Sequence, residues 1–178
     1  MHILLGVTGS YSTAEINELI SAFQAVGHEV KVVATKNAMP FLRGKFPLGV
    51  DFWDAEKVPD INLCTWSDIL VVAPLSANTL AKFANGLCDD LLTTIFLSWD
   101  FNKPVILSRE MKSRMWENMI TKSHLTTLKQ FLRDNGKPSV SITDSRMWAQ
   151  VVPSIDDIEY VMEEVKYIVM AVNRVQTK

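Results

Sequence analysis

Two short runs of small residues with hydroxyl and amide groups have the composition of ligand-binding loops. The first is GVTGSYS at residues 6–12, and the second is APLSANT at residues 73–79. Such groups hydrogen-bond a polar ligand, and a helix N-terminus behind them attracts its anionic end, so a phosphate fits both runs. Each run also has a purely structural interpretation. The first is not G-x-G-x-x-G and lacks a Walker lysine, and the second is equally consistent with a helix cap.

The elements around these runs predict a parallel sheet that would bring them together. Residues 3–7 and 69–73 are apolar, too short for a helix and followed by glycine or proline, which predicts buried strands. A helix capped by Thr13 and ended by Gly27, then a strand at residues 29–35, complete a βαβ unit. Further helices are expected at residues 76–85, 87–96, 115–132 and 155–172, with strands at 105–107 and 139–142 and an uncertain third strand within 43–63.

The fold class predicted from this order is α/β, with an open Rossmann-like (flavodoxin-like) parallel sheet and helices on both faces. The 178 residues, 48% of them hydrophobic, suit a single domain that spans residues 1–178. Ligands of such sheets bind beyond the carboxyl ends of the strands, where both runs are expected.

Composition excludes several classes of partner. The net charge of -2 and 21% charged residues leave no basic field for nucleic acid. No apolar run approaches the roughly 18–20 residues that cross a bilayer, and no secretory signal opens the chain, so we expect no membrane partner and a cytoplasmic location. The two cysteines lack C-x-x-C spacing, so we expect neither a disulfide framework nor a metal site.

The second run and its continuation, residues 73–93, resemble the PASANT signature of the homo-oligomeric flavin-containing cysteine decarboxylases. That family includes phosphopantothenoylcysteine decarboxylases and lantibiotic peptidyl-cysteine decarboxylases. The resemblance spans most of the chain, through TKNAMPF at residues 35–41, MKSRMW at residues 111–116 and residues 121–125.

The resemblance implies FMN as the cofactor, and the missing dinucleotide fingerprint favours FMN over FAD or NAD. Phe41 would lie near the flavin ring, although it also suits a core position, and Thr35 could instead be a strand-end hydroxyl. The positions that the resemblance assigns to FMN binding are Gly9, Ser10, Tyr11, Thr35, Phe41, Ser76, Ala77, Asn78, Thr79 and Met111.

Three positions depart from the family's catalytic motifs. The histidine base of an H-I-E-L-type segment is replaced by Asp60, whose unperturbed pKa of about 3.9 makes it a weaker base than histidine at about 6.5. The motif P-x-M-N-x-x-M-W begins here with Arg109 and has Lys112 in place of its asparagine. Lys112 either attracts a substrate carboxylate or is a solvated charge at a helix start. Residues 142–150 lack the clamp cysteine of phosphopantothenoylcysteine decarboxylases, which disfavours that subclass.

The leading functional hypothesis is FMN-dependent oxidative decarboxylation of a cysteinyl compound or another small-molecule or peptide carboxylate, with Asp60 and Lys112 as the catalytic residues. The alternative is a non-catalytic FMN carrier or regulatory subunit. A flavin prenyltransferase is less favoured, because the PLSANT and Met-Trp signatures indicate the decarboxylase branch.

The resemblance also implies a homotrimer or a homododecamer built from trimers. Five tryptophans and eight methionines agree with this, because such side chains are enriched at the centres of interfaces. A tryptophan-rich monomer core is the alternative interpretation.

Overall fold

The computed structural model describes residues 1–42, 46, 51–54, 62–134, 140–144, 168–170 and 172–173. Within these ranges, strands alternate with helices along the chain. The strands are β1 (His2–Val7), β2 (Glu29–Ala34), β3 (Asp51–Asp54), β4 (Ile69–Leu75), β5 (Val105–Arg109) and β6 (Val140–Asp144). The α-helices are α1 (Ile16–Ala25), α2 (Asn62–Trp66), α3 (Ala77–Asn85), α4 (Leu91–Leu97), α5 (Ser113–Trp116) and α6 (Met119–Asp134), and the 3-10 turns are η1 (Tyr11–Glu15) and η2 (Met39–Phe41).

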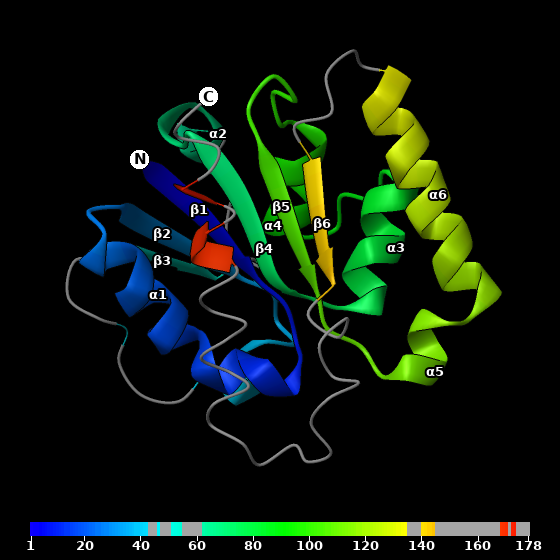
Figure 1. Ribbon diagram of the computed structural model, residues 1–178, viewed down its shortest axis with the longest axis horizontal. Coiled ribbons are helices and arrows are strands. Elements are labelled where there is room, and N and C mark those ends of the chain that lie inside the picture. The colour runs from blue at the N-terminus through cyan, green and yellow to red at the C-terminus, as the bar shows by residue number, and fades with distance from the viewer. Residues whose placement is uncertain are drawn as a thin grey trace.

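The strands form one parallel sheet of six in the order β3-β2-β1-β4-β5-β6. Successive side chains of a strand face opposite sides, so Leu4 packs on one face of the sheet while Ile3 and Leu5 pack on the other. The Leu4 face is covered by α3 and α4, and the Ile3 face by α1 (Figure 1). The predicted fold class, an open parallel sheet with helices on both faces, is confirmed.

The strand order reverses between β1 and β4, which lie side by side at the centre of the sheet. Chain order proceeds outward from β1 through β2 to β3 on one side and from β4 to β6 on the other. In open α/β sheets such a switch point leaves a crevice beyond the carboxyl ends, because the connections diverge to opposite faces. The two ligand-binding runs follow β1 and β4, so the topology brings them to this crevice.

Two predicted helix starts were wrong, and local hydrogen bonds explain both. Thr13 does not cap α1. Instead its Oγ1 accepts from Ser10 N at 3.1 Å and donates to Thr8 O at 2.7 Å, which forms η1 before α1 begins at Ile16. The helix predicted from residue 87 begins at Leu91, because the carboxylate of Asp90 accepts from Thr93 N at 2.8 Å and caps it.

The helix predicted at residues 115–132 is two helices, α5 and α6. Asn118 Oδ1 accepts from Ile120 N at 2.9 Å, so an asparagine cap starts α6 after the short α5 has ended. Of the helix predicted at residues 155–172, only residues 168–170 and 172 lie within the described ranges, and they are helical.

One strand settles an uncertain prediction and another is longer than expected. The uncertain third strand is Asp51–Asp54, which pairs with β2. Strand β4 continues through Pro74 to Leu75, and its pairing with β5 shifts register between Val72 and Leu75. Proline has no N–H to donate to the hydrogen bonds between strands. The shift in register at this point allows β4 to continue past Pro74.

The tryptophans differ in how deeply they are buried. Trp99 is buried in the core, as the interpretation of a tryptophan-rich monomer core expects. Trp66 and Trp116 are half-buried. Trp148 and the side chain of Trp53 lie outside what the structure describes. Among the described helices, none is long and apolar enough to cross a membrane.

Candidate functional site

The two ligand-binding runs are joined by a single buried side chain. Thr8 Oγ1 donates to Pro74 O at 2.7 Å and accepts from Ser76 N at 2.8 Å, which links the carboxyl ends of β1 and β4. Thr8 is fully buried, so water does not compete for these bonds. The loop after β1 is therefore held in a fixed position against the start of α3.

The start of α3 is stabilised from within the second run. Ser76 is its N-cap, where Oγ accepts from Thr79 N at 3.3 Å and contacts Thr79 Oγ1 at 3.1 Å. Thr79 is buried, whereas Asn78 is exposed and Ala77 half-buried. The cap is thus built by the protein, and Asn78 is left available to a ligand at the helix N-terminus.

Glycine is required at position 9 by a close approach of two loops. A Cβ built there would lie 2.5 Å from Asn37 O and 2.8 Å from Asn37 C. From the sequence, Gly9 was predicted to bind the cofactor. The structure shows that it also lets the loop after β1 pack against the turn after β2.

A cleft of about 360 Å³ opens where these loops meet, beyond the carboxyl ends of β1, β2 and β4. Its size falls within the usual range of small-molecule sites, roughly 300–1,000 Å³. One wall comes from the turns after β1 and β2, and the other from α3, the turn before α4, and α5. The cleft is lined by Gly9, Thr35, Lys36, Asn37, Ser76, Ala77, Asn78, Thr79, Lys82, Asp89, Asp90 and Met115.

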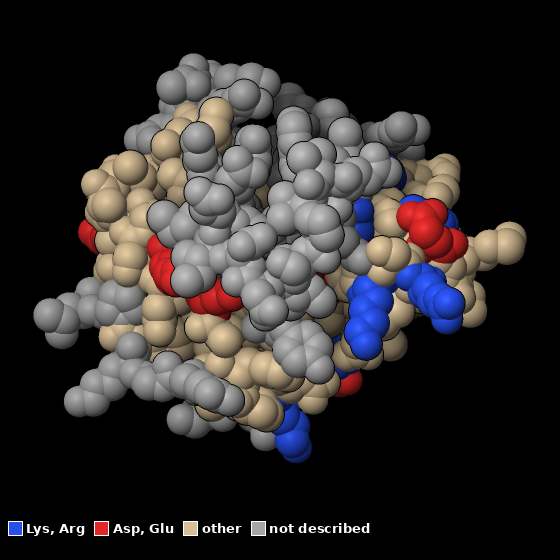
Figure 2. Space-filling view, turned by 60° about the horizontal axis from the view of Figure 1, so that its bottom comes forward, with Lys and Arg blue, Asp and Glu red and all other residues tan. Residues whose placement is uncertain are grey.

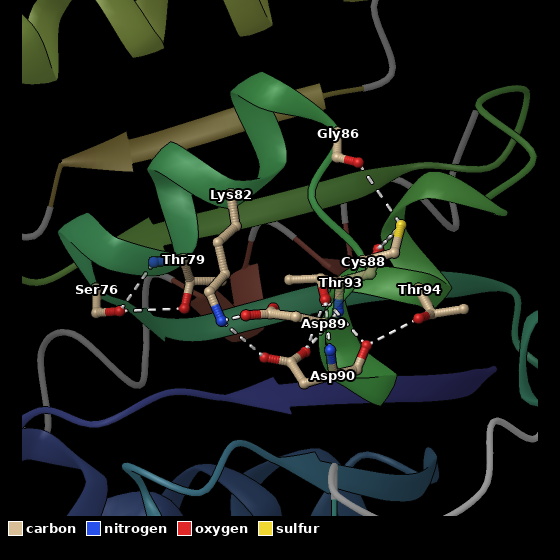
Figure 3. Close-up of polar contacts among 9 residues, drawn as sticks. All are labelled: Ser76, Thr79, Lys82, Gly86, Cys88, Asp89, Asp90, Thr93 and Thr94. Atoms are coloured by element: carbon tan, nitrogen blue, oxygen red, sulfur yellow. Dashed lines mark hydrogen bonds and ion pairs between the residues drawn. The ribbon is translucent and has the colours of Figure 1, made fainter.

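Three charged side chains form a network on the α3 wall (Figure 3). Lys82 Nζ lies 2.7 Å from Asp89 Oδ1 and 3.3 Å from Asp90 Oδ2, and Asp90 also caps α4. Burial by itself lowers the pKa of Lys82, but the two carboxylates outweigh it and the pKa is raised. Its hydrogen bond to Lys82 lowers the pKa of Asp89. Lys82 and Asp89 are therefore ionised at neutral pH, and the contacts of Lys82 with Asp89 and Asp90 link α3 to the turn before α4.

The opposite wall contains a hydroxyl that has no partner. Thr35 follows β2 and is buried, and within the described part of the structure its Oγ1 forms no hydrogen bond. Buried polar groups in folded proteins are almost always hydrogen-bonded, because an unmet group costs about 1–3 kcal/mol. A ligand in the cleft is the natural source of that bond.

Six of the ten residues predicted to bind a cofactor line this cleft, two from the turns after β1 and β2 and four from the second run. They are Gly9, Thr35, Ser76, Ala77, Asn78 and Thr79.

The other predicted residues divide into three groups. Ser10 and Phe41 are half-buried beside the cleft, in the turns after β1 and β2, but do not line it. Met111 is buried in the core on the α3 face and is not among the residues that line the cleft. Lys112 is exposed at the N-terminus of α5. Asp60 and the side chain of Tyr11 lie outside what the structure describes.

Sequence reasoning missed the charged part of the cleft. Lys82 lies three residues after Thr79, the spacing that places both on one side of a helix, and this was the available signal. Asp89 and Asp90 belong to a turn whose path could not be predicted. Met115 reaches the cleft because α5 is a separate short helix.

Comparison with known proteins decides the family. The Flavoprotein family matches residues 1–175. The chain belongs to this family. Among curated relatives, it is 40% identical over 138 residues to phosphopantothenoylcysteine decarboxylase of Oryza sativa subsp. japonica, covering 71% of this chain and 62% of that one. It is 39% identical over 140 residues to the Mus musculus enzyme of the same name, covering 72% and 69%. The chain thus spans about two thirds of the length of these relatives.

Solved structures agree with this assignment. A mutant PPC decarboxylase in complex with pantothenoylaminoethenethiol is 36% identical, with a TM-score of 0.70 and 80% coverage of both chains. The FMN binding protein AtHal3 is 36% identical, with a TM-score of 0.69 and coverage of 79% and 78%. The peptidyl-cysteine decarboxylase EpiD is 26% identical, with a TM-score of 0.67 and 80% coverage of both chains. The resemblance predicted from residues 73–93 is confirmed, and so is the assignment of FMN as the cofactor of this flavoprotein.

Proposed function

We propose that this flavoprotein holds FMN in the cleft between Thr35 and α3 and decarboxylates a cysteinyl compound or another small-molecule or peptide carboxylate. The unmet hydroxyl of Thr35 is the observation that carries the proposal, because it is a buried polar atom on the wall of a cleft that contains the N-terminus of α3. Decarboxylase relatives of both substrate kinds support it.

The residues of the cleft suit a phosphorylated, hydroxyl-rich cofactor. The start of α3 offers backbone N–H groups and the Asn78 amide to the anionic end of the cofactor. Thr35 offers a hydroxyl to the same cleft. The two lysines and two aspartates on the walls balance in charge, so the dipole at the N-terminus of α3 decides which end of the ligand enters there.

Bound FMN would supply the electron sink for oxidation of a substrate thiol. A thiol that loses two electrons and two protons becomes a thioaldehyde. The bond between the α-carbon and the carboxylate would then break, so that carbon dioxide leaves and the bonding electron pair stays on the substrate as an enethiolate. The protein must orient the substrate and accept the thiol proton. We assign proton acceptance to Asp60 and attraction of the substrate carboxylate to Lys112, in place of the family's histidine and asparagine.

A second candidate is a carrier or regulatory subunit that binds FMN without catalysis. The position of Lys112 favours it, because this side chain is exposed at the start of α5 and is absent from the described cleft wall. A binding protein needs the cleft but not the two substituted positions.

Purified protein separates the two candidates. We expect it to be yellow and to release FMN on heating, as identified by mass spectrometry, and release of FAD would contradict the proposal. Under anaerobic conditions, thiol-bearing carboxylates should bleach the colour and release carbon dioxide if the protein is an enzyme. A yellow protein that no such compound bleaches would favour the non-catalytic carrier or regulatory subunit.

Asn78→Ala tests the cleft itself. Asn78 is exposed, so its removal should leave the thermal midpoint unchanged, while FMN affinity falls by about 1 kcal/mol or more through the loss of a hydrogen-bonding amide. Asn85→Ala is the matched control, since Asn85 is exposed at the other end of α3. Equal FMN affinity in both variants would remove Asn78 from the site.

We also propose that the working unit is a homotrimer or a homododecamer built from trimers. The five tryptophans support this, because aromatic side chains are enriched at the centres of interfaces. In such an assembly, Asp60 could act at a neighbour's cleft. Sedimentation velocity tests the proposal, and a monomer that holds FMN at full occupancy would contradict it.

A further inference from the structure

The carboxyl end of β5 carries a buried arginine. Arg109 is the last residue of the strand, is 3% exposed, and pairs in register with Leu75, the residue before the N-cap of α3. Burying a guanidinium is expensive unless other groups compensate its charge. Arginine here also departs from the P-x-M-N-x-x-M-W motif, which begins with proline at this position.

The guanidinium stacks on the last residue of the same motif. Arg109 Cζ lies 3.8 Å from the ring centroid of Trp116, the final residue of α5. A second cation, Lys122 Nζ, lies 4.1 Å from the same centroid, but this side chain is 40% exposed and pairs with Glu117 at 3.5 Å. Cation–π attraction grows as the cation loses water, so the buried contact of Arg109 is the stronger one.

The stack fixes a helix that is too short to hold itself in place. Helix α5 has four residues, so its own hydrogen bonds contribute little to its stability. Trp116 packs against the core at one side, and the preceding Met115 lines the cleft. Basic and acidic side chains lie together on the surface at the α5 side of this edge (Figure 2).

We propose that Arg109 is a positioning residue for the cofactor cleft. Through Trp116 it holds α5 against the carboxyl end of β5, and this places Met115 on the cleft wall. The inference rests on the proposed FMN cleft. It assigns Arg109 no contact with cofactor or substrate.

Two matched substitutions test the proposal, Arg109→Leu and Lys122→Leu, which each remove one cation from the same ring. Titration of cofactor-free protein with FMN, followed by flavin fluorescence, should show about a tenfold weaker dissociation constant for Arg109→Leu and less than about threefold for Lys122→Leu. Arg109→Lys keeps a charge over the ring and should stay within about threefold of the native protein.

A second readout reports the position of α5. Dilute hydrogen peroxide oxidises accessible methionines, and peptide mass spectrometry measures Met115 and Met119 in the same sample. Bound FMN should slow oxidation at Met115, which lines the cleft, and not at Met119, which is 86% exposed. In Arg109→Leu saturated with FMN, the protection of Met115 should be lost while Met119 is unchanged.

The outcomes separate this inference from the proposed function. Native protein that binds no FMN would overturn the cleft itself. Native protein that binds FMN, together with Arg109→Leu that keeps both its affinity and its protection of Met115, would overturn only the role of Arg109. Equal weakening by Arg109→Lys and Arg109→Leu would show that a cation over Trp116 is not what places α5. Faster oxidation of Met111, which is 7% exposed in the core, together with Met115 would indicate general loosening and would also contradict the proposal.

Discussion

The two walls of the cleft differ in how their polar groups are satisfied. On the α3 wall, Ser76 and Thr79 bond to each other, and Lys82 is held by Asp89 and Asp90. On the wall after β2, Thr35 Oγ1 is buried without a partner among the described residues. On the first wall the polar groups are satisfied by the protein, whereas on the second the Thr35 hydroxyl has no partner among the described residues.

This difference predicts two kinds of mutational effect. Substitutions on the α3 wall should lower the free energy of unfolding whether or not FMN is present. Substitutions on the wall after β2 should change FMN affinity more than the stability of the cofactor-free protein. Four substitutions test the comparison.

Asp90→Ala should have the largest effect. It removes the cap of α4 and one partner of Lys82, which leaves both Thr93 N and the ammonium short of an acceptor. We expect a loss of about 2–3 kcal/mol in the free energy of unfolding, measured by urea denaturation of cofactor-free protein. Asp90→Asn keeps the cap and should lose less. If Asp90→Ala were as stable as the native protein, the polar contacts of the α3 wall would not stabilise the cofactor-free fold, which would contradict the comparison.

Gly9→Ala should come next and should affect binding as well. The new methyl group would lie 2.5 Å from Asn37 O, so the turn after β2 must move, at a cost of about 1–3 kcal/mol. Gly27→Ala is the control, because Gly27 has a φ of 83° and open space around it, far from the cleft. Both variants should unfold at lower urea concentration, but only Gly9→Ala should bind FMN more weakly. Equal FMN affinity in the two would show that the approach of these loops does not shape the site.

Thr35→Val should separate binding from stability. Valine has the shape of threonine without the hydroxyl, so removing an unmet polar group leaves the cofactor-free protein as stable as the native one or slightly more so. FMN affinity should fall by about 1 kcal/mol, or roughly fivefold, measured by fluorescence titration. Unchanged affinity would sink the idea that the ligand supplies the partner of Thr35.

Asp89→Asn should have the smallest effect, and it should depend on pH. The bond to Lys82 lowers the pKa of Asp89, so its contribution to stability is present above the unfolded pKa and is lost as pH falls through the lowered folded value. Asp89 is exposed, so the thermal midpoint should fall only slightly at pH 7. The difference from native protein should vanish in acid. A difference that persists there would mean that the ion pair is not its cause.

The sheet could be predicted from sequence because buried parallel strands are short apolar runs ended by glycine or proline, as at residues 3–7 and 69–73. Helix starts could not be predicted where more than one polar side chain is available to cap the helix. Asp90 starts α4 four residues late relative to prediction, and Asn118 divides one predicted helix into two. These caps depend on which of several polar residues turns toward the backbone, and that is a tertiary choice.

Within the site, residues in contiguous motifs were predictable and residues brought in by tertiary packing were not. Ser76 and Asn78 follow one strand and reach the cleft together. Met111 and Met115 belong to one motif, but a turn and a short helix separate them, so the first enters the core and the second the cleft. Arg109 was noted only as a departure from the motif, because nothing in the sequence showed that it reaches Trp116.

The bonds of Thr8 have a consequence for when the protein can acquire its cofactor. They join residues 66 and 68 positions apart, across two parallel strands that are neighbours in the sheet but not consecutive along the chain. Contacts of such sequence separation form late in folding, because the closure of a long loop precedes any gain from it. A chain emerging from the ribosome therefore has no cleft until β4 and α3 have been made. Loading with FMN should follow folding rather than guide it, so added FMN should slow unfolding of this protein without accelerating its refolding.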